Sequence, residues 1–289
     1  MIDYLIAILI FVSIYGFVAL GLNVQWGLTG LINLGQVAFF AVGAYTIALA
    51  TKAGLPFFAA LVLAAFLSAV LGSLVALFTP RLRDDYLAIV TLGMSEFIRL
   101  IFLNEKWIAG GPDGVASIPR PAVIPGMNSE LSFLVITAVV LALAFWFVRR
   151  LEGYPFGRTL RAIREDETVV ASVGKIPLFY KTQAFVIGAM LAGIGGAFFA
   201  AYLSYVSPDM FGTNVSIYVL AAVLLGAQGS SLGTLAGTVV VTALLEGTRL
   251  IKDSITFIDG VQLAALRLIL LGLALMIIVV VRYRPRRQS

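Results

Sequence analysis

Long apolar segments separated by short polar stretches run through the whole chain of 289 residues. Most of these segments hold about 20 residues, which is enough for an α-helix to cross the hydrocarbon core of a bilayer. They are continuously apolar rather than alternating, and this favours helices over the strands of a membrane barrel. The pattern predicts an all-α, polytopic membrane protein with about 8–10 transmembrane segments in one domain, residues 1–289. The predicted segments are 4–22, 29–50, 57–79, 86–104, 131–148, 179–203, 214–228, 231–250 and 263–281.

The composition agrees with a chain that lies in a lipid bilayer. Hydrophobic residues make up 61% of the chain and charged residues 12%, and the mean hydropathy is +1.03. The chain has no cysteine and no histidine, which excludes disulfides, thiolate metal sites and histidine-based catalysis. We therefore expect no cofactor and no metal. We attribute the net charge of +5 to residues that anchor the protein at the cytoplasmic surface, not to a nucleic-acid partner.

The basic residues indicate which ends of the segments face the cytoplasm. Thirteen of the 20 lysines and arginines lie in three stretches that fall on one side of the membrane if the segments are correct. The positive-inside rule places that side, including the C-terminal tail 282–289, in the cytoplasm. An odd number of crossings would then put the N-terminus outside. The three basic stretches are 80–85, 149–181 and 282–289, and the basic-poor connections opposite them are 105–130, 204–213 and 251–262.

The stretch 157–180, "GRTLRAIREDETVVASVGKIPLFY", is unusually charged for so apolar a chain. A single helix would mix Asp166 and Glu167 into its apolar side, so we predict a break there. The two acids would begin a second short helix, where negative charge is favoured. Gly174 would end that helix, and Pro177 would prevent its continuation. The alternative is one amphipathic helix that rests on the membrane surface.

Small residues form two stripes along segment 179–203. Lipid gives helices no hydrophobic reason to associate, so a smooth face of glycine and alanine favours close packing of backbones. We predict that this face presses against another helix. One stripe is Gly188, Ala192, Gly196 and Ala200, and the other is Ala189, Gly193, Ala197 and Ala201.

Two glycine-interrupted stretches, "GLNVQWGLTGLINLGQVAFF" (residues 21–40) and "LLGAQGSSLGTLAG" (residues 224–237), predict broken or re-entrant helices. Polar side chains and irregular backbone are tolerated at membrane depth where they are buried in protein or line a watery cavity. Asn33, Gln36 and Gln228 lie in these stretches and are candidates for the substrate path. The alternative is that Asn33 and Gln36 only satisfy neighbouring backbone groups. The pairs Gly27/Gly30 and Gly226/Gly229 lie in corresponding places in the two halves and suggest an internal repeat.

Glu96 and Arg99 are three residues apart in segment 86–104, so they share a helix face and are predicted to form an ion pair. Such a pair would neutralise two charges in the bilayer, or it would line the substrate path. The chain lacks the series of buried carboxylates that a proton-coupled carrier needs.

Several motifs resemble, in the same order, those of ABC-importer permeases of the branched-chain amino-acid type, the LivH/LivM family and specifically its LivM members. Together they cover roughly residues 20–250. The first four are "LINLGQVAFFAVGAYTIAL", "RLRDDYLAIVTLGMSEFIRLI", "AGGPDG" and "VSPDMFG", and the fifth is residues 157–200. The sequence "LLGAQGSSLG" departs from the family's usual Gly-Gly-x-Gly form and leaves the substrate open.

The resemblance implies a cytoplasmic coupling segment, residues 151–178, that docks into a groove on an ATPase subunit. Within it, "VVASVG" resembles the Ala-x-x-Gly core of the coupling element. The residues that the resemblance assigns to coupling are Arg164, Glu165, Val170, Ala171 and Gly174. The implied partners are a LivH-like second permease, two ATPase subunits and a periplasmic binding protein that delivers an amino acid. The resemblance also implies a transport subunit of a bacterial inner membrane, not an enzyme.

Other functions remain open on the sequence alone. Related permeases carry urea, amides or aromatic acids rather than branched-chain amino acids. A secondary carrier would have only Glu96 and Glu246 as coupling carboxylates, and an intramembrane enzyme would need a Ser–Lys or paired-Asp site. The chain has no Walker A pattern, so ATP hydrolysis is expected on separate subunits.

Overall fold

A computed structural model describes residues 2–77, 84–254, 269, 272–273 and 276 of the chain. The described part is almost entirely helical, and its one sheet has two short strands. The predicted segment 263–281 and the predicted tail 282–289 lie largely or wholly outside the described residues. The helices of the first half are α1 (Ile2–Leu22), the π-helix η1 (Asn23–Leu28), α2 (Gln36–Lys52), α3 (Phe57–Ala76), α4 (Asp84–Asn104), α5 (Lys106–Ala109) and the 3₁₀-helix η3 (Gly111–Asp113). The rest are β1 (Val115–Ala116), α6 (Ser129–Gly153), α7 (Pro155–Glu165), α8 (Glu167–Ser172), α9 (Pro177–Leu203), β2 (Tyr205–Val206), the 3₁₀-helix η4 (Pro208–Phe211), α10 (Thr213–Leu225) and α11 (Ser231–Ser254).

The described helices confirm a polytopic helical membrane protein. Five of them are long and apolar enough to cross a bilayer: α1 with η1, α3, α4, α6 and α9. Three shorter apolar helices, α2, α10 and the first part of α11, accompany them. The predicted segment 29–50 is wrong at its start, because α2 begins only at Gln36. Residues 29–35 instead connect η1 to α2, with Gly30 at a positive φ of 82° that favours glycine.

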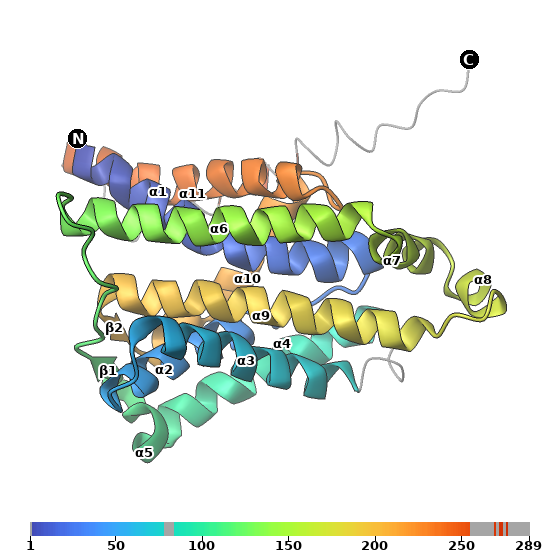
Figure 1. The fold of residues 1–289 in the computed structure, drawn as a ribbon, viewed down its shortest axis with the longest axis horizontal. Coiled ribbons are helices and arrows are strands. Elements are labelled where there is room, and N and C mark those ends of the chain that lie inside the picture. Colours follow the sequence, from blue (N-terminus) through green and yellow to red (C-terminus); the bar gives the residue numbers. More distant parts are fainter. Residues whose placement is uncertain (1, 78–83, 255–268, 270–271, 274–275, 277–289) are drawn as a thin grey trace.

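Helix α9 forms the centre of the bundle and packs against α1, α2 and α3 (Figure 1). Its small residues allow this, because a Cβ atom at Gly196 would lie only 1.8 Å from the Phe40 carbonyl oxygen of α2. A Cβ atom at Gly193 would lie 2.1 Å from the Ser68 hydroxyl of α3. The residues of both stripes are buried: Gly188, Ala189, Ala192, Gly193, Gly196, Ala197, Ala200 and Ala201.

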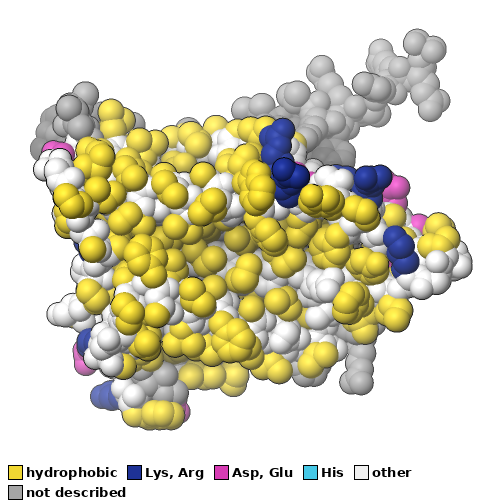
Figure 2. Space-filling model, viewed as in Figure 1, with side chains coloured by type: hydrophobic (Ala, Val, Ile, Leu, Met, Phe, Trp, Pro, Cys, Tyr) yellow, Lys and Arg dark blue, Asp and Glu magenta, His cyan; other side chains and the backbone are white. Residues whose placement is uncertain are grey.

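The two ends of the bundle differ in structure (Figure 1). At one end lie α5 and the sheet, in which β1 pairs antiparallel with β2, Val115 opposite Val206. At the other end, α6 runs into α7, and α8 projects beyond the bundle. Figure 2 shows a broad hydrophobic face between these ends, with basic side chains gathered where α6 meets α7. The N-terminus lies at the end opposite α8.

Candidate functional site

The charged stretch forms two short helices joined at Asp166. This residue has an extended conformation between α7 and α8, and its carboxylate caps α8 by accepting hydrogen bonds from the Thr168 and Val169 N–H groups at 2.8 and 3.3 Å. The pKa of Asp166 lies below its ordinary value, mainly because its carboxylate accepts a hydrogen bond from the Thr168 hydroxyl and, to a smaller extent, because it accepts those from the two N–H groups. Gly174 follows α8 with a φ of 79°, and α9 begins at Pro177. The break is therefore observed at Asp166, where it was predicted. The second helix ends just before Gly174, and the next helix begins at Pro177, as was also predicted.

Two lysines hold the projecting segment to the bundle. The Lys175 ammonium donates a hydrogen bond to the Thr159 hydroxyl of α7 at 2.7 Å. The Lys181 ammonium of α9 pairs with the Glu167 carboxylate of α8 at 2.5 Å. These contacts fix α8 relative to α7 and α9, so the exposed side chains of α8 have defined positions.

Most of α8 and the turn after it is exposed, although several of its side chains are apolar. Ala171 and Gly174 are exposed, as is Glu165 at the end of α7. Val170 is different, because its side chain is only 4% exposed and faces the protein. It therefore supports α8 from inside and offers no free surface in this structure. The exposed apolar side chains are Val169, Val173, Ile176 and Phe179, each more than half exposed.

Arg164 connects α7 to both glycine-interrupted stretches. One guanidinium nitrogen donates to the Gly27 carbonyl oxygen of η1 at 2.6 Å. The other terminal nitrogen donates to the Gln228 side-chain oxygen at 3.2 Å, in the turn between α10 and α11. The structure thus brings together a residue assigned to coupling and a residue assigned to the substrate path. We call this arrangement, with Gly27 and Gln228, the Arg164 junction.

The two interrupted stretches also contact each other beneath Arg164. The Asn23 side-chain oxygen accepts a hydrogen bond from the Gly229 N–H at 2.8 Å. A Cβ atom at Gly27 would lie 2.7 Å from the Gly229 nitrogen, so the close approach needs glycine. Because one stretch follows the first helix and the other joins the last two described helices, this contact links distant parts of the chain.

Glu152 of α6 completes the polar cluster, and the sequence interpretation did not single it out. Its two carboxylate oxygens accept hydrogen bonds from the Asn23 amide at 3.3 Å and the Ser231 hydroxyl at 3.1 Å. The available signal was one acid within the basic run "RRLEGYPFGR", but nothing local indicated partners at positions 23 and 231. The cluster thus joins α6, η1 and α11 as well as α7.

Asn33 and Gln36 form a closed amide network rather than an open lining. The Asn33 amide donates to the side-chain oxygens of Gln25 and Gln36 at 2.7 and 2.8 Å. The Gln36 amide donates to the Gly188 carbonyl oxygen of α9 at 3.1 Å. Both side chains are at most 1% exposed. These contacts favour the alternative in which the amides satisfy neighbouring groups at the helix break.

Glu96 and Arg99 form the predicted ion pair on α4, at 2.5 Å. Arg99 also reaches the Asp209 carboxylate of η4 at 3.4 Å. The pair therefore joins α4 to η4, toward the end of the bundle opposite α8. Glu96 is 42% exposed and Arg99 21% exposed, so the charges lie at the surface of this chain.

Comparison with known proteins decides the family. The family model described as "Branched-chain amino acid transport system / permease component" matches residues 4–280. The chain belongs to this family of permeases. It is 39% identical over 258 residues to the high-affinity branched-chain amino acid transport system permease protein LivM of Salmonella typhimurium, a match that covers 81% of this chain. The chain spans 61% of the length of that relative.

Two further relatives show how widely the similarity extends. The probable branched-chain amino acid transport permease protein LivM of Methanocaldococcus jannaschii is 27% identical, with 98% of this chain and 92% of that protein covered. The autoinducer 2 import system permease protein LsrC of Klebsiella pneumoniae is 32% identical over 160 residues, 53% of this chain and 44% of that protein. No solved structure matches the chain.

Proposed function

We propose that this chain is the transmembrane permease subunit of an ATP-binding-cassette importer that moves amino acids, chiefly branched-chain ones, into the cytoplasm. The family supports transport through the membrane, and the exposed α7–α8 segment supports docking of a soluble subunit. In this proposal the substrate arrives from a periplasmic binding protein, and a LivH-like permease completes the pathway. Two separate ATPase subunits hydrolyse ATP.

The observation that carries the coupling role is the Arg164 junction. Arg164 belongs to α7, whose neighbour α8 would contact the ATPase, and it holds Gly27 and Gln228 at the two helix breaks. Movement of α7 on the ATPase would therefore act on both breaks at once. A charge-assisted hydrogen bond is stronger than a neutral one, which suits a link that must transmit movement.

This role requires α7 and α8 to face the cytoplasm. The basic residues at that end of the bundle support this orientation through the positive-inside rule. The predicted cytoplasmic tail, 282–289, lies outside the described residues. The N-terminus would then lie on the outer side, together with the β1–β2 sheet.

Reconstitution of the assembled importer in vesicles tests the function. We expect leucine uptake that requires ATP and the binding protein. Arg164→Gln should lower uptake at least several-fold while the subunits stay assembled, because it removes the charged link to Gly27. Arg158→Gln, on the exposed side of α7, serves as the matched control and should leave uptake unchanged. Uptake that is independent of ATP would contradict the proposal and favour a secondary carrier.

The substrate is tested separately, because the LsrC similarity shows that related permeases belong to systems for other molecules. Competition of unlabelled isoleucine, valine, urea, amides, aromatic acids and autoinducer 2 against labelled leucine compares these classes directly. Competition by isoleucine and valine alone supports the branched-chain assignment. ATP-driven uptake of another class without leucine uptake would retain the importer and refute its substrate.

A further inference from the structure

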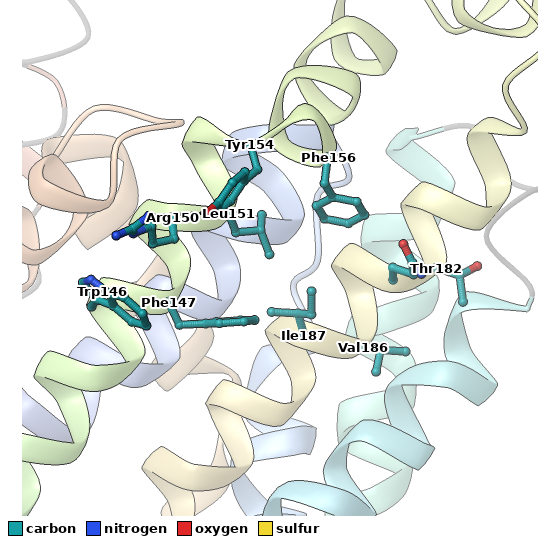
Figure 3. A pocket seen from close by; sticks show the side chains of 10 residues that line it. Trp146, Phe147, Arg150, Leu151, Tyr154, Phe156, Thr182, Val186 and Ile187 are labelled. Atoms are coloured by element: carbon teal, nitrogen blue, oxygen red, sulfur yellow. Dashed lines mark hydrogen bonds between the residues drawn. The ribbon is translucent and has the colours of Figure 1, made fainter.

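An open apolar groove lies on the side of the bundle between α6 and α9, close to the start of α7. Its volume is about 780 Å³, within the range of about 300–1,000 Å³ for pockets that hold drug-sized molecules. Figure 3 shows that Phe147 of α6 and Ile187 of α9 point toward each other across it. Leu151, Phe156 and Val186 extend the apolar walls. We call this feature the α6–α9 groove.

The rim of the α6–α9 groove carries a cation without an acidic partner. The Arg150 guanidinium lies over the Trp146 ring, 5.3 Å from its centroid. It also approaches the Tyr154 hydroxyl at 3.4 Å. None of the ion pairs within the described residues includes Arg150, and none of the residues lining the groove is acidic. Its remaining N–H donors are therefore available to an anionic ligand.

The level of the groove along α6 suits the boundary between hydrocarbon and headgroups. Trp146 and Tyr154 are the residue types enriched at that boundary. The helix is apolar up to Trp146 and becomes basic at Arg149 and Arg150, three and four residues later. A ligand at this level would have its apolar part beside Phe147 and its charged part at Arg150.

We propose that the α6–α9 groove binds an anionic phospholipid. Its phosphate contacts the Arg150 guanidinium, whose fork matches phosphate oxygens in a bidentate arrangement. One acyl chain lies between Phe147 and Ile187. Thr182 and Gln183, on the α9 wall, add neutral hydrogen-bonding groups for the headgroup. Basic pockets between transmembrane helices are the typical site for anionic lipids.

Photo-crosslinking lipids test this proposal on the unmodified chain. The full-length protein is reconstituted in vesicles of equimolar phosphatidylglycerol and phosphatidylcholine, with a diazirine on the acyl chain of one lipid at a time. After illumination, mass spectrometry measures lipid adducts on peptides that contain Phe147 and Ile187. We expect phosphatidylglycerol to label these peptides about fivefold more than phosphatidylcholine, the ratio that corresponds to about 1 kcal/mol for one basic residue near the surface.

Two arginines adjacent on α6 give a matched pair of variants. Arg150→Gln should reduce the labelling ratio to about one, because it removes the cation on the groove. Arg149→Gln should leave the ratio unchanged, since Arg149 lies over Phe145 and does not line the groove. If Arg150→Gln fails to fold, raising the salt concentration with the wild-type protein supplies the same test, because screening should lower the ratio.

Three results would overturn the proposal. Equal labelling by both lipids in the wild-type protein would remove the anionic preference. Preferential labelling that is confined to peptides elsewhere on the chain would remove the groove. The third result would come from the same experiment in vesicles that contain the assembled importer. Loss of groove labelling there, together with crosslinks from these peptides to another subunit, would identify a protein as the occupant.

Discussion

Replacing Gly196 with alanine tests whether the centre of the bundle depends on direct contact between backbones. The added Cβ atom would lie 1.8 Å from the Phe40 carbonyl oxygen, whereas ordinary van der Waals contact begins at 3.4 Å. Relief of the clash requires these two atoms to move apart by the difference, 3.4 − 1.8 = 1.6 Å, and so requires a shift between α2 and α9. The partner atom is backbone, so no side chain can rotate away. Overpacking typically costs about 1–3 kcal/mol, and we expect the upper part of that range or more.

Gly93→Ala is the matched control, because it makes the same chemical change within a helix. Gly93 lies in α4, and a Cβ atom there would have nothing within 4 Å. Alanine is favoured over glycine inside a helix by about 0.5–1 kcal/mol, so this variant should be as stable as the wild type or slightly more stable. Denaturant unfolding of the purified chain in detergent, followed by tryptophan fluorescence, measures both. Equal stability of the two variants would refute the close-packing argument.

Three further predictions concern separate parts of the molecule. Gln36→Leu should destabilise the purified chain by about 1–3 kcal/mol for each buried polar group left unpaired, while leucine transport per assembled complex stays unchanged. Lower transport per assembled complex would return Gln36 to the substrate path. Ala171→Trp should weaken assembly with the ATPase subunit, because α8 exposes Ala171, whereas Ala122→Trp, at an exposed position in the connection before α6, should not. Co-purification of the ATPase subunit with each variant measures this effect, and equal yields would remove α8 from the docking surface. Ser172→Cys should be protected from an impermeant thiol reagent in intact cells, whereas Ser117→Cys, next to β1, should be labelled. The reverse pattern would show that α8 faces the outside and would contradict the proposed orientation.

The helices and the ends of the charged stretch could be predicted because their signals are local. Continuous apolar runs specify membrane helices, and Asp166, Gly174 and Pro177 each mark a helix boundary through their own backbone preferences. The stripes on α9 indicated close packing in the same way, since Gly193 and Gly196 follow the helical repeat. The neighbours of these glycines were not predictable, because a smooth face does not specify which helix it contacts.

The connections within the candidate site could not be derived from local patterns. Arg164 and Gly27 are 137 residues apart, and Asn23 and Gly229 are 206 residues apart. Spacing along one helix carries no information about such pairs. Val170 shows the same difficulty at short range, because its exposure depends on how α8 folds back on its neighbours. The amides of Asn33 and Gln36 were recognised as important, but only their partners distinguish a structural network from a path lining.

Crosslinking from α8 to the ATPase subunit tests the central claim most directly. The chain has no cysteine of its own, so Ala171→Cys provides a single thiol on the exposed side of α8. A heterobifunctional reagent with a maleimide and a photoreactive group is applied to the assembled importer. We expect an adduct between this chain and the ATPase subunit, the same yield when Arg164→Gln is added because the subunits stay assembled, and no adduct from Ala122→Cys. Failure of Ala171→Cys to form the adduct in an importer that is active and contains the ATPase would contradict the docking role of α8.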